Sequence, residues 1–218
     1  MDRSIDAGMA KLKDKLLLMG GYVEKAIEEA TQGLVESKPE KFARVHEFEK
    51  TVNQLHKEVD EDCLNLLATQ SPLAKDLRTI LAVIKINTDL ERMGDQAVNI
   101  SYNAVEYLRD TPIKPLIDIP RMADQARFMV REALDAFVRT DLKLAEDVLS
   151  RDDAVDKLKD QIFRELLTYM ISEPKRIEQA LCLILIARNL ERVGDHATNI
   201  AEDVIFIATG KDVRHGGA

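Results

Sequence analysis

Apolar residues recur at spacings of three and four along most of this chain, and no other feature constrains the fold as strongly. An α-helix completes a turn in about 3.6 residues, so side chains at these spacings share one face. The sequence lacks the apolar–polar alternation that would predict β-strands. The first run with helical spacing is Ile5, Met9, Leu12, Leu16, Met19, Val23, Ile27, Ala30 and Leu34. The sequence therefore predicts an all-α protein whose helices each bury a narrow apolar stripe.

Prolines divide this pattern into six long helices. Pro39, Pro72 and Pro174 stand where new helices begin, which suits a residue without a backbone N–H. The one proline-rich stretch, residues 110–120, is expected to be a linker. Asp141 is expected to cap the fifth helix and Gly210 to end the sixth, with a frayed tail beyond it. The helices are predicted at about residues 5–34, 40–69, 73–109, 120–139, 142–170 and 174–208.

The two halves of the chain are related in sequence. A shift of about 100 to 103 residues aligns Val52 with Val155 and Pro72 with Pro174. Each half then contains three helices joined by short connections, which favours antiparallel neighbours. We therefore expect two tandem, sequence-related three-helix bundles of antiparallel helices, one in residues 1–112 and one in residues 113–218.

Composition narrows the class of protein. The formal net charge is −8, and no basic cluster interleaved with aromatic residues is present, so nucleic-acid binding is not expected. Cys63 and Cys182 lie in different halves and are expected to be buried, reduced thiols. The amino-terminal segment does not resemble a signal peptide, and no apolar run is long enough to span a bilayer. These features predict a soluble, cytoplasmic protein.

One block is repeated far more faithfully than the rest. Residues 90–100 read LERMGDQAVNI and residues 190–200 read LERVGDHATNI, with eight of the eleven positions identical. Packing against the core would require only that the residues on the inward face be apolar. In both copies this face is predicted to be a continuous row of apolar residues, which we call a seam. The seams are Val83, Ile86, Leu90, Met93, Ala97, Ile100 and Ala104, and Leu183, Ile186, Leu190, Val193, Ala197, Ile200 and Val204. The identical polar residues therefore need another explanation.

The polar residues of the block form a row beside each seam, at spacings of four residues. The first row is Glu91, Asp95 and Asn99, and the second is Glu191, Asp195 and Asn199. Carboxylates four apart on a helix repel by about 0.2–0.5 kcal/mol, and a helical glycine such as Gly94 or Gly194 costs about 1 kcal/mol relative to alanine. A cation shared by the carboxylates would turn this repulsion into attraction, because hard divalent ions prefer oxygen ligands.

A cation needs further ligands from a neighbouring helix. The best candidates are Glu49 and Asn53 in the first half and Asp152 and Asp156 in the second, again four residues apart. His196, which replaces a glutamine of the first copy, is a candidate nitrogen ligand. The competing interpretation is an ordinary solvated acidic face, neutralised by Arg92 and Arg192 of the same block. Both interpretations remain open on the residues alone.

The duplicated motifs Glu91-Arg-Met-Gly-Asp95 and Glu191-Arg-Val-Gly-Asp195 resemble the signature of the PhoU family, and the resemblance extends over nearly the whole chain. It implies two three-helix bundles that bind iron, zinc, manganese or magnesium through Glu91, Asp95, Glu191 and Asp195. The resemblance is less close at the remaining candidate ligands, which are Asn99, Asn199, Glu49, Asp152 and Asp156.

The resemblance also implies a non-enzymatic negative regulator of phosphate uptake and of the phosphate-starvation response. Its partners would be a phosphate-sensing histidine kinase and the ATPase subunit of the phosphate ABC transporter. The protein would then reach the membrane only through them. Arg92 and Arg192 are weaker candidates for partner contacts, and a homodimer is expected.

Two other functions remain as alternatives. A metal-free helical adaptor with the same partners would use the acids to contact basic surfaces directly. A carboxylate-bridged metalloenzyme or metal store of the ferritin type would need Glu-x-x-His motifs that project inward, and no histidine of this chain lies three residues after a glutamate.

Overall fold

The computed structural model describes residues 4–211, and within this range it contains six α-helices, a short 3₁₀ turn and no strand. The helices are α1 (Ser4–Val35), α2 (Lys41–Thr69), α3 (Ala74–Tyr107), α4 (Asp118–Arg139), α5 (Leu142–Ser172) and α6 (Ile177–Thr209). These bounds confirm the all-α prediction and differ from the expected ones by a few residues at each end. The largest difference is at the start of α6, where Pro174–Arg176 forms the 3₁₀ turn and the α-helix begins only at Ile177.

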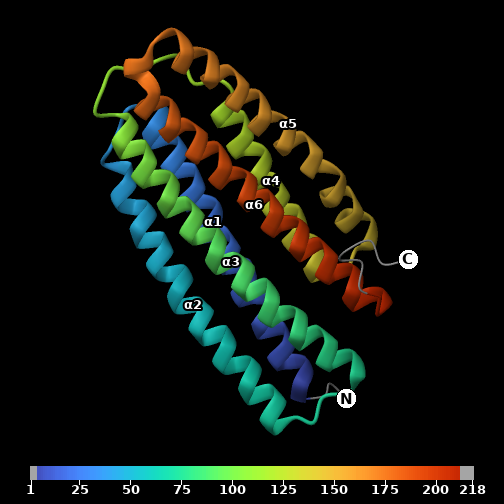
Figure 1. The fold of residues 1–218 in the computed structure, drawn as a ribbon. Helices are drawn as coiled ribbons and strands as arrows, with labels where there is room; N and C mark the ends of the chain where they lie inside the picture. The colour runs from blue at the N-terminus through green and yellow to red at the C-terminus, as the bar shows by residue number, and fades with distance from the viewer. Residues whose placement is uncertain (1–3, 212–218) are drawn as a thin grey trace.

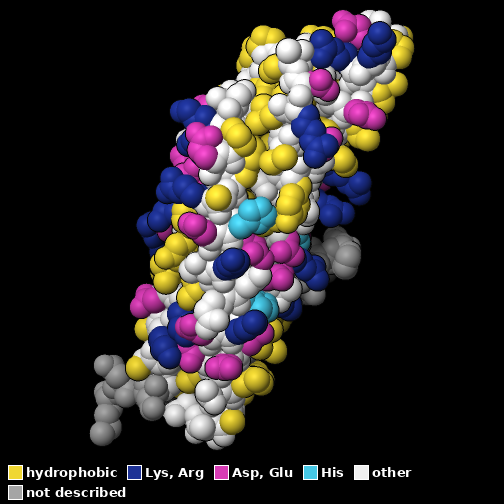
Figure 2. Space-filling model, turned by 90° about the vertical axis from the view of Figure 1, so that its left-hand side faces the viewer, with side chains coloured by type: hydrophobic (Ala, Val, Ile, Leu, Met, Phe, Trp, Pro, Cys, Tyr) yellow, Lys and Arg dark blue, Asp and Glu magenta, His cyan; other side chains and the backbone are white. Residues whose placement is uncertain are grey.

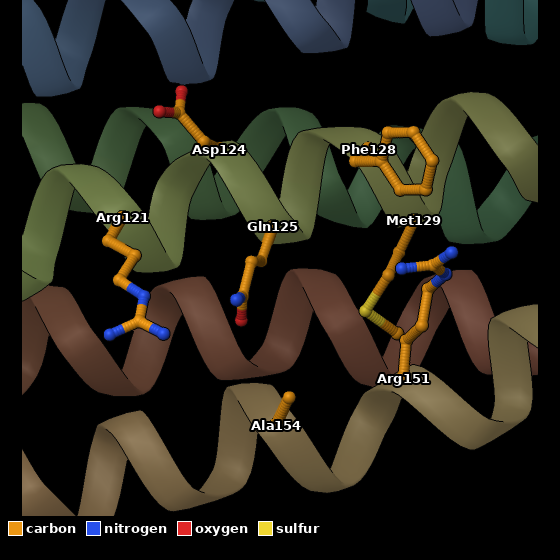
Figure 3. Close-up of a pocket in the computed structure, with 7 residues that line it drawn as sticks. All are labelled: Arg121, Asp124, Gln125, Phe128, Met129, Arg151 and Ala154. Atoms are coloured by element: carbon orange, nitrogen blue, oxygen red, sulfur yellow. The ribbon is translucent and has the colours of Figure 1, made fainter.

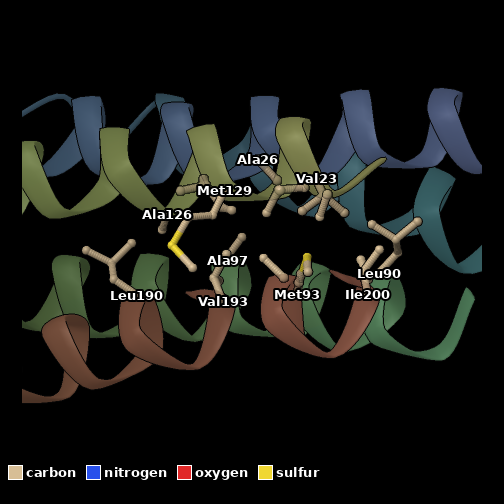
Figure 4. Close-up of a cluster of buried hydrophobic side chains, with 14 of the residues drawn as sticks. Val23, Ala26, Leu90, Met93, Ala97, Ala126, Met129, Leu190, Val193 and Ile200 are labelled. Carbon is tan, nitrogen blue, oxygen red and sulfur yellow. The ribbon is translucent and has the colours of Figure 1, made fainter. Parts of the chain in front are cut away.

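The helices form two tandem three-helix bundles, α1–α3 and α4–α6, which lie along one another (Figure 1). Within the pair of bundles, α3 packs against α6 and α1 packs against α4. As a result, a single cluster of buried apolar side chains runs through both bundles. Figure 4 shows part of this cluster, with Val23 of α1, Met93 of α3, Met129 of α4 and Val193 of α6 meeting in one interior. The halves of the sequence therefore share one core.

The predicted seams of α3 and α6 face this core. All fourteen seam residues named from the sequence have an accessible surface of 0%. Burying an apolar side chain of this size stabilises the fold by about 1.5–3 kcal/mol, so these two stripes fix the orientation of both helices. Because the seams point inward, the residues one position further along must lie at the edge of the core, where the acidic rows are found.

The predicted helix ends are largely confirmed. Asp141 Oδ1 accepts a hydrogen bond from the backbone N–H of Leu144 at 3.1 Å, which caps α5. Gly210 ends α6 with a φ of 75°, a left-handed conformation that glycine adopts without strain. The expected fraying of the tail lies outside the described residues.

Cys63 and Cys182 are both buried and free. Burial raises the pKa of the Cys63 thiol to about 12, so this side chain stays a neutral thiol. Among the described residues, no helix is apolar over a stretch long enough to cross a bilayer.

Candidate functional site

The second repeat places four carboxylates between α5 and α6, and we call them the second acidic cluster: Asp152, Asp156, Glu191 and Asp195. Asp152 and Asp156 are on α5, and the other two are on α6. Three of them are partly exposed, and Asp195 lies at the surface. The structure therefore brings together the two pairs that the sequence analysis placed on neighbouring helices.

Burial and mutual repulsion raise the pKa values of two carboxylates in this cluster. Burial raises the pKa of Asp152 to about 6, and the carboxylates of Asp195, Asp156 and Glu191 add to the shift in that order. The pKa of Asp195 is raised as well, first by desolvation of its partly shielded carboxylate and then by Glu191 and Asp156. Negative charge is thus concentrated here beyond what the surroundings neutralise, which is the electrostatic condition that favours binding of a cation.

A lysine partly compensates the second acidic cluster, and the sequence analysis missed it. Lys159 Nζ lies 3.2 Å from Asp156 Oδ1 and 3.1 Å from Glu191 Oε1. The hydrogen bond to Glu191 is the main factor that raises the pKa of Lys159. Its position three residues after Asp156 was a signal in the sequence, because side chains three apart lie on the same face of a helix. An ion shared by Asp156 and Glu191 would have to displace this ammonium group.

The α5 side chains that face Gly194 would make ordinary van der Waals contact with a Cβ atom at this position. A Cβ atom added at Gly194 would lie 3.4 Å from Asp152 Oδ1 and 3.6 Å from Val155 Cγ1. In the first repeat, a Cβ at Gly94 would lie 3.3 Å from Val52 Cγ1. The atoms that approach both glycines are side chains.

The first repeat has a weaker counterpart, the first acidic cluster, made of Glu49, Asn53, Glu91 and Asp95. Asn53 donates a hydrogen bond to Glu49, and the other amide atom of Asn53, its buried Oδ1, has no hydrogen-bond partner. Burial and then Asp95 raise the pKa of Glu91, whereas His56 counteracts the shift. Figure 2 shows acidic side chains gathered between two histidines near the middle of one face of the protein. The first acidic cluster carries one carboxylate fewer than the second.

His196 and Asn199 of the second repeat contact α3 and not the second acidic cluster. His196 Nδ1 lies 2.8 Å from Asp89 Oδ1 on α3, and Asn199 Nδ2 donates to the same oxygen at 3.2 Å. Asp89 is 7% exposed, so this contact lies inside the α3–α6 interface. The prediction that His196 adds a nitrogen ligand to the cluster is therefore not supported. Asn99, the counterpart of Asn199, is exposed on α3.

Arg92 and Arg192 do not form ion pairs with the acids of their own rows, although the charge of Arg92 partly counteracts the raised pKa of Glu91. Both are exposed, and neither forms an ion pair within residues 4–211. They line opposite parts of a polar pocket of about 690 Å³ between α3 and α6, together with Gln96, Asp195 and His196. Among the described residues, Lys159 pairs with Glu191 of the second row, and the charges of His56 and Arg92 act on Glu91 of the first.

The donor set of the two clusters fits a hard cation in its chemistry. Carboxylate and amide oxygens suit magnesium, manganese and ferrous iron, whereas zinc more often takes nitrogen or sulfur ligands. In the described part of the chain, however, no three His, Cys, Asp or Glu side chains are placed to ligate one ion. The carboxylates that the sequence predicted as ligands are thus assembled within electrostatic range but are not pre-arranged around a single point.

The fold and the two clusters define a class: duplicated helical bundles that present one acidic cluster per repeat at the surface. Two segments of the chain, residues 16–104 and 119–204, each match the sequence pattern of the PhoU domain. The chain belongs to the PhoU family.

Relatives and solved structures agree with this assignment. A phosphate-specific transport system accessory protein PhoU homolog from Pseudomonas putida is 39% identical over 100% of this chain and 85% of its own length. A homolog of the same name from Aquifex aeolicus is 36% identical over 95% of this chain and 94% of its own length. The crystal structure of PhoU from Pseudomonas aeruginosa superimposes with a TM-score of 0.91 at 37% identity, covering 95% of this chain and 100% of that one. A structure from Streptococcus pneumoniae, with a TM-score of 0.87 at 23% identity, supports the fold.

Proposed function

We propose that this protein is a non-enzymatic, cytoplasmic adaptor that binds metal ions and negatively regulates phosphate uptake and the phosphate-starvation response. The observation that carries the proposal is the acidic cluster in each repeat, placed beside the core and open at the surface. Relatives that span the whole chain are named as accessory proteins of the phosphate-specific transport system, which supports the biological context.

In this proposal the cation is held by carboxylates of two helices at once. Asp152 and Asp156 would supply α5 oxygens, and Glu191 and Asp195 would supply α6 oxygens. An ion there removes the repulsion that raises the pKa of Asp152, and it links the outer helix to the central one. Glu49, Glu91 and Asp95 would play the same part in the first repeat, with lower affinity because one carboxylate is replaced by Asn53.

The metal-bearing face would then dock on partner proteins. We propose that the partners are a phosphate-sensing histidine kinase and the ATPase subunit of the phosphate ABC transporter, and that the protein is held at the membrane only by them. Binding would keep the signalling complex repressed when phosphate is plentiful. A homodimer would present two such faces to the complex.

The proposal is tested by capture of partners from cells grown in high and in low phosphate. Wild-type protein should recover the kinase and the ATPase subunit in high phosphate, and a chain with both Glu191→Ala and Asp195→Ala should recover less of them. Asp153→Asn, an exposed change next to the cluster, is the matched control. Equal recovery with the double variant would refute a role for the cluster in docking.

Lys159 supports a second candidate function, a metal-free adaptor. Its ammonium group already bridges Asp156 and Glu191, so the second cluster has a protein cation in place. In this version the remaining acids contact basic surfaces of the partners directly. Metal analysis of tag-free protein purified without chelator distinguishes the two functions, because only the first predicts a bound ion that is lost in the double variant.

A further inference from the structure

A pocket of about 490 Å³ lies between α4 and α5, on the other side of α5 from its contact with Glu191. Its wall includes the apolar side chains of Phe128, Met129 and Ala154. Figure 3 shows Gln125 and Arg121 extending from α4 into the space beside α5, with Arg151 extending from α5 toward Phe128. A volume of this size is within the range of sites that hold a small ligand or a large side chain.

The first repeat carries two aromatic residues at the positions that correspond to Gln125 and Arg151. The register that aligns Glu49 with Asp152 also aligns Tyr22 with Gln125 and Phe48 with Arg151. Tyr22 and Phe48 pack together with ring centroids 5.9 Å apart and join the edge of the core. In the second repeat a glutamine and an arginine stand at these positions, and both line the pocket.

The second repeat leaves polar groups of the pocket without partners. The buried Oε1 atom of Gln125 has no hydrogen-bond partner, which is unfavourable for a buried carbonyl. Arg121 forms no ion pair or hydrogen bond within residues 4–211, and Arg151 lies over the Phe128 ring at 4.7 Å from its centroid. The one acid of the lining, Asp124, is 3.6 Å from Arg127 and points away from the pocket in Figure 3.

We propose that this pocket binds an aromatic side chain carried by an acidic peptide segment of a partner protein. The ring would take the place that Tyr22 and Phe48 fill in the first repeat, against Met129 and Ala154. Flanking carboxylates would pair with the two guanidinium groups of Arg121 and Arg151, which suit bidentate recognition of carboxylates. A tyrosine is favoured, because its hydroxyl could donate to the unpartnered Oε1 of Gln125. The site requires no metal ion and is independent of the proposed regulation of phosphate uptake.

The test is a titration of the full chain, labelled with ¹³C at the methionine methyl groups and followed by NMR. The probe is a capped pentapeptide with one tyrosine between two pairs of aspartates, and the comparison peptide has alanine in place of tyrosine. The tyrosine peptide should shift the Met129 methyl signal by its ring current and leave the Met93 signal unchanged. The alanine peptide should leave both unchanged. Arg151→Gln should weaken the binding about tenfold, the effect of losing one charge-assisted contact.

A variant that fills the pocket provides the decisive control. Gln125→Tyr combined with Arg151→Phe copies the aromatic pair of the first repeat, so it should fold, melt at a higher temperature and no longer bind the peptide. Arg44→Gln is the matched control, since Arg44 also lies over a ring, that of Phe48, but lines no pocket named here. Binding that persists in the filled variant, or no shift of Met129 with wild type, would overturn the proposal. A Met129 shift that depends on protein concentration without peptide would do so too, because it would identify a second copy of this chain as the occupant.

Discussion

Replacing Asp152 by asparagine should stabilise the metal-free protein at neutral pH. The change keeps the shape of the side chain and removes one charge from the second acidic cluster. Folding raises the pKa of Asp152 from 3.8 to about 6, a shift of about two units. At about 1.4 kcal/mol per unit the penalty would be at most about 3 kcal/mol. Because the group is only partly buried, solvent screening reduces this to about 1–2 kcal/mol.

The pH dependence of this gain follows from the direction of the shift. The folded protein holds the proton on Asp152 more tightly than the unfolded chain does. This group therefore lowers the stability of the wild type as pH rises from about 4 to about 6. The asparagine variant should be more stable at pH 7.5, where the carboxyl is ionised in both states. The gain should disappear near pH 4, where the folded wild type is protonated.

The assay is thermal and chemical unfolding in the presence of a chelator at both pH values. A gain of about 1–2 kcal/mol corresponds to a rise in Tm of about 3–6 °C for a domain of this size. Asp153→Asn is the control, because its side chain is 86% exposed and its ion pair with Lys157 is 3.8 Å long. That variant should change stability by less than about 0.5 kcal/mol. A variant at Asp152 that is no more stable than wild type at pH 7.5, or equally stabilised at pH 4, would refute the reasoning.

Three further substitutions probe neighbouring features. Lys159→Met should tighten binding of a divalent ion about three- to tenfold in titration calorimetry, because the competing ammonium group is removed; unchanged affinity would contradict this. Asp89→Ala should cost about 2–3 kcal/mol in urea unfolding, since it removes the buried acceptor that His196 contacts; a cost below about 0.5 kcal/mol would contradict it. Gly194→Ala should raise stability by up to about 1 kcal/mol, and more than Gly94→Ala, whose Cβ would meet Val52 at 3.3 Å; the opposite order would be inconsistent with these contacts.

The helices and their buried faces could be predicted from the sequence because both depend on local spacing. The seam through Leu90 and its counterpart through Leu190 are buried as expected, because a helix with one apolar face packs that face against the core. The row of acids beside each stripe then follows from geometry. Asp152 was predicted to join Asp195 on different grounds: it lies on a neighbouring helix, with Asp156 four residues further on, and a cation needs ligands from more than one helix.

Other features depend on how the helices are turned toward each other, which local spacing does not determine. The contact of His196 with Asp89 exists because α3 packs against α6, and the repeat pattern alone does not specify this packing. Lys159 shares a helix face with Asp156, but its contact with Glu191 depends on the packing of α5 against α6. The α4–α5 pocket likewise depends on how these two helices pack, which the spacing of residues along each helix does not specify.

Metal stoichiometry is the direct test of the proposal that the carboxylates of α5 and α6 together bind a cation. Tag-free wild-type protein, purified without chelator and dialysed against ferrous iron, manganese or magnesium, should retain bound ions when analysed by mass spectrometry of the elements. The Glu191→Ala and Asp195→Ala double variant should keep its helical circular dichroism and lose the ions bound in the second repeat. Equal metal content in the folded double variant and the wild type would contradict the claim.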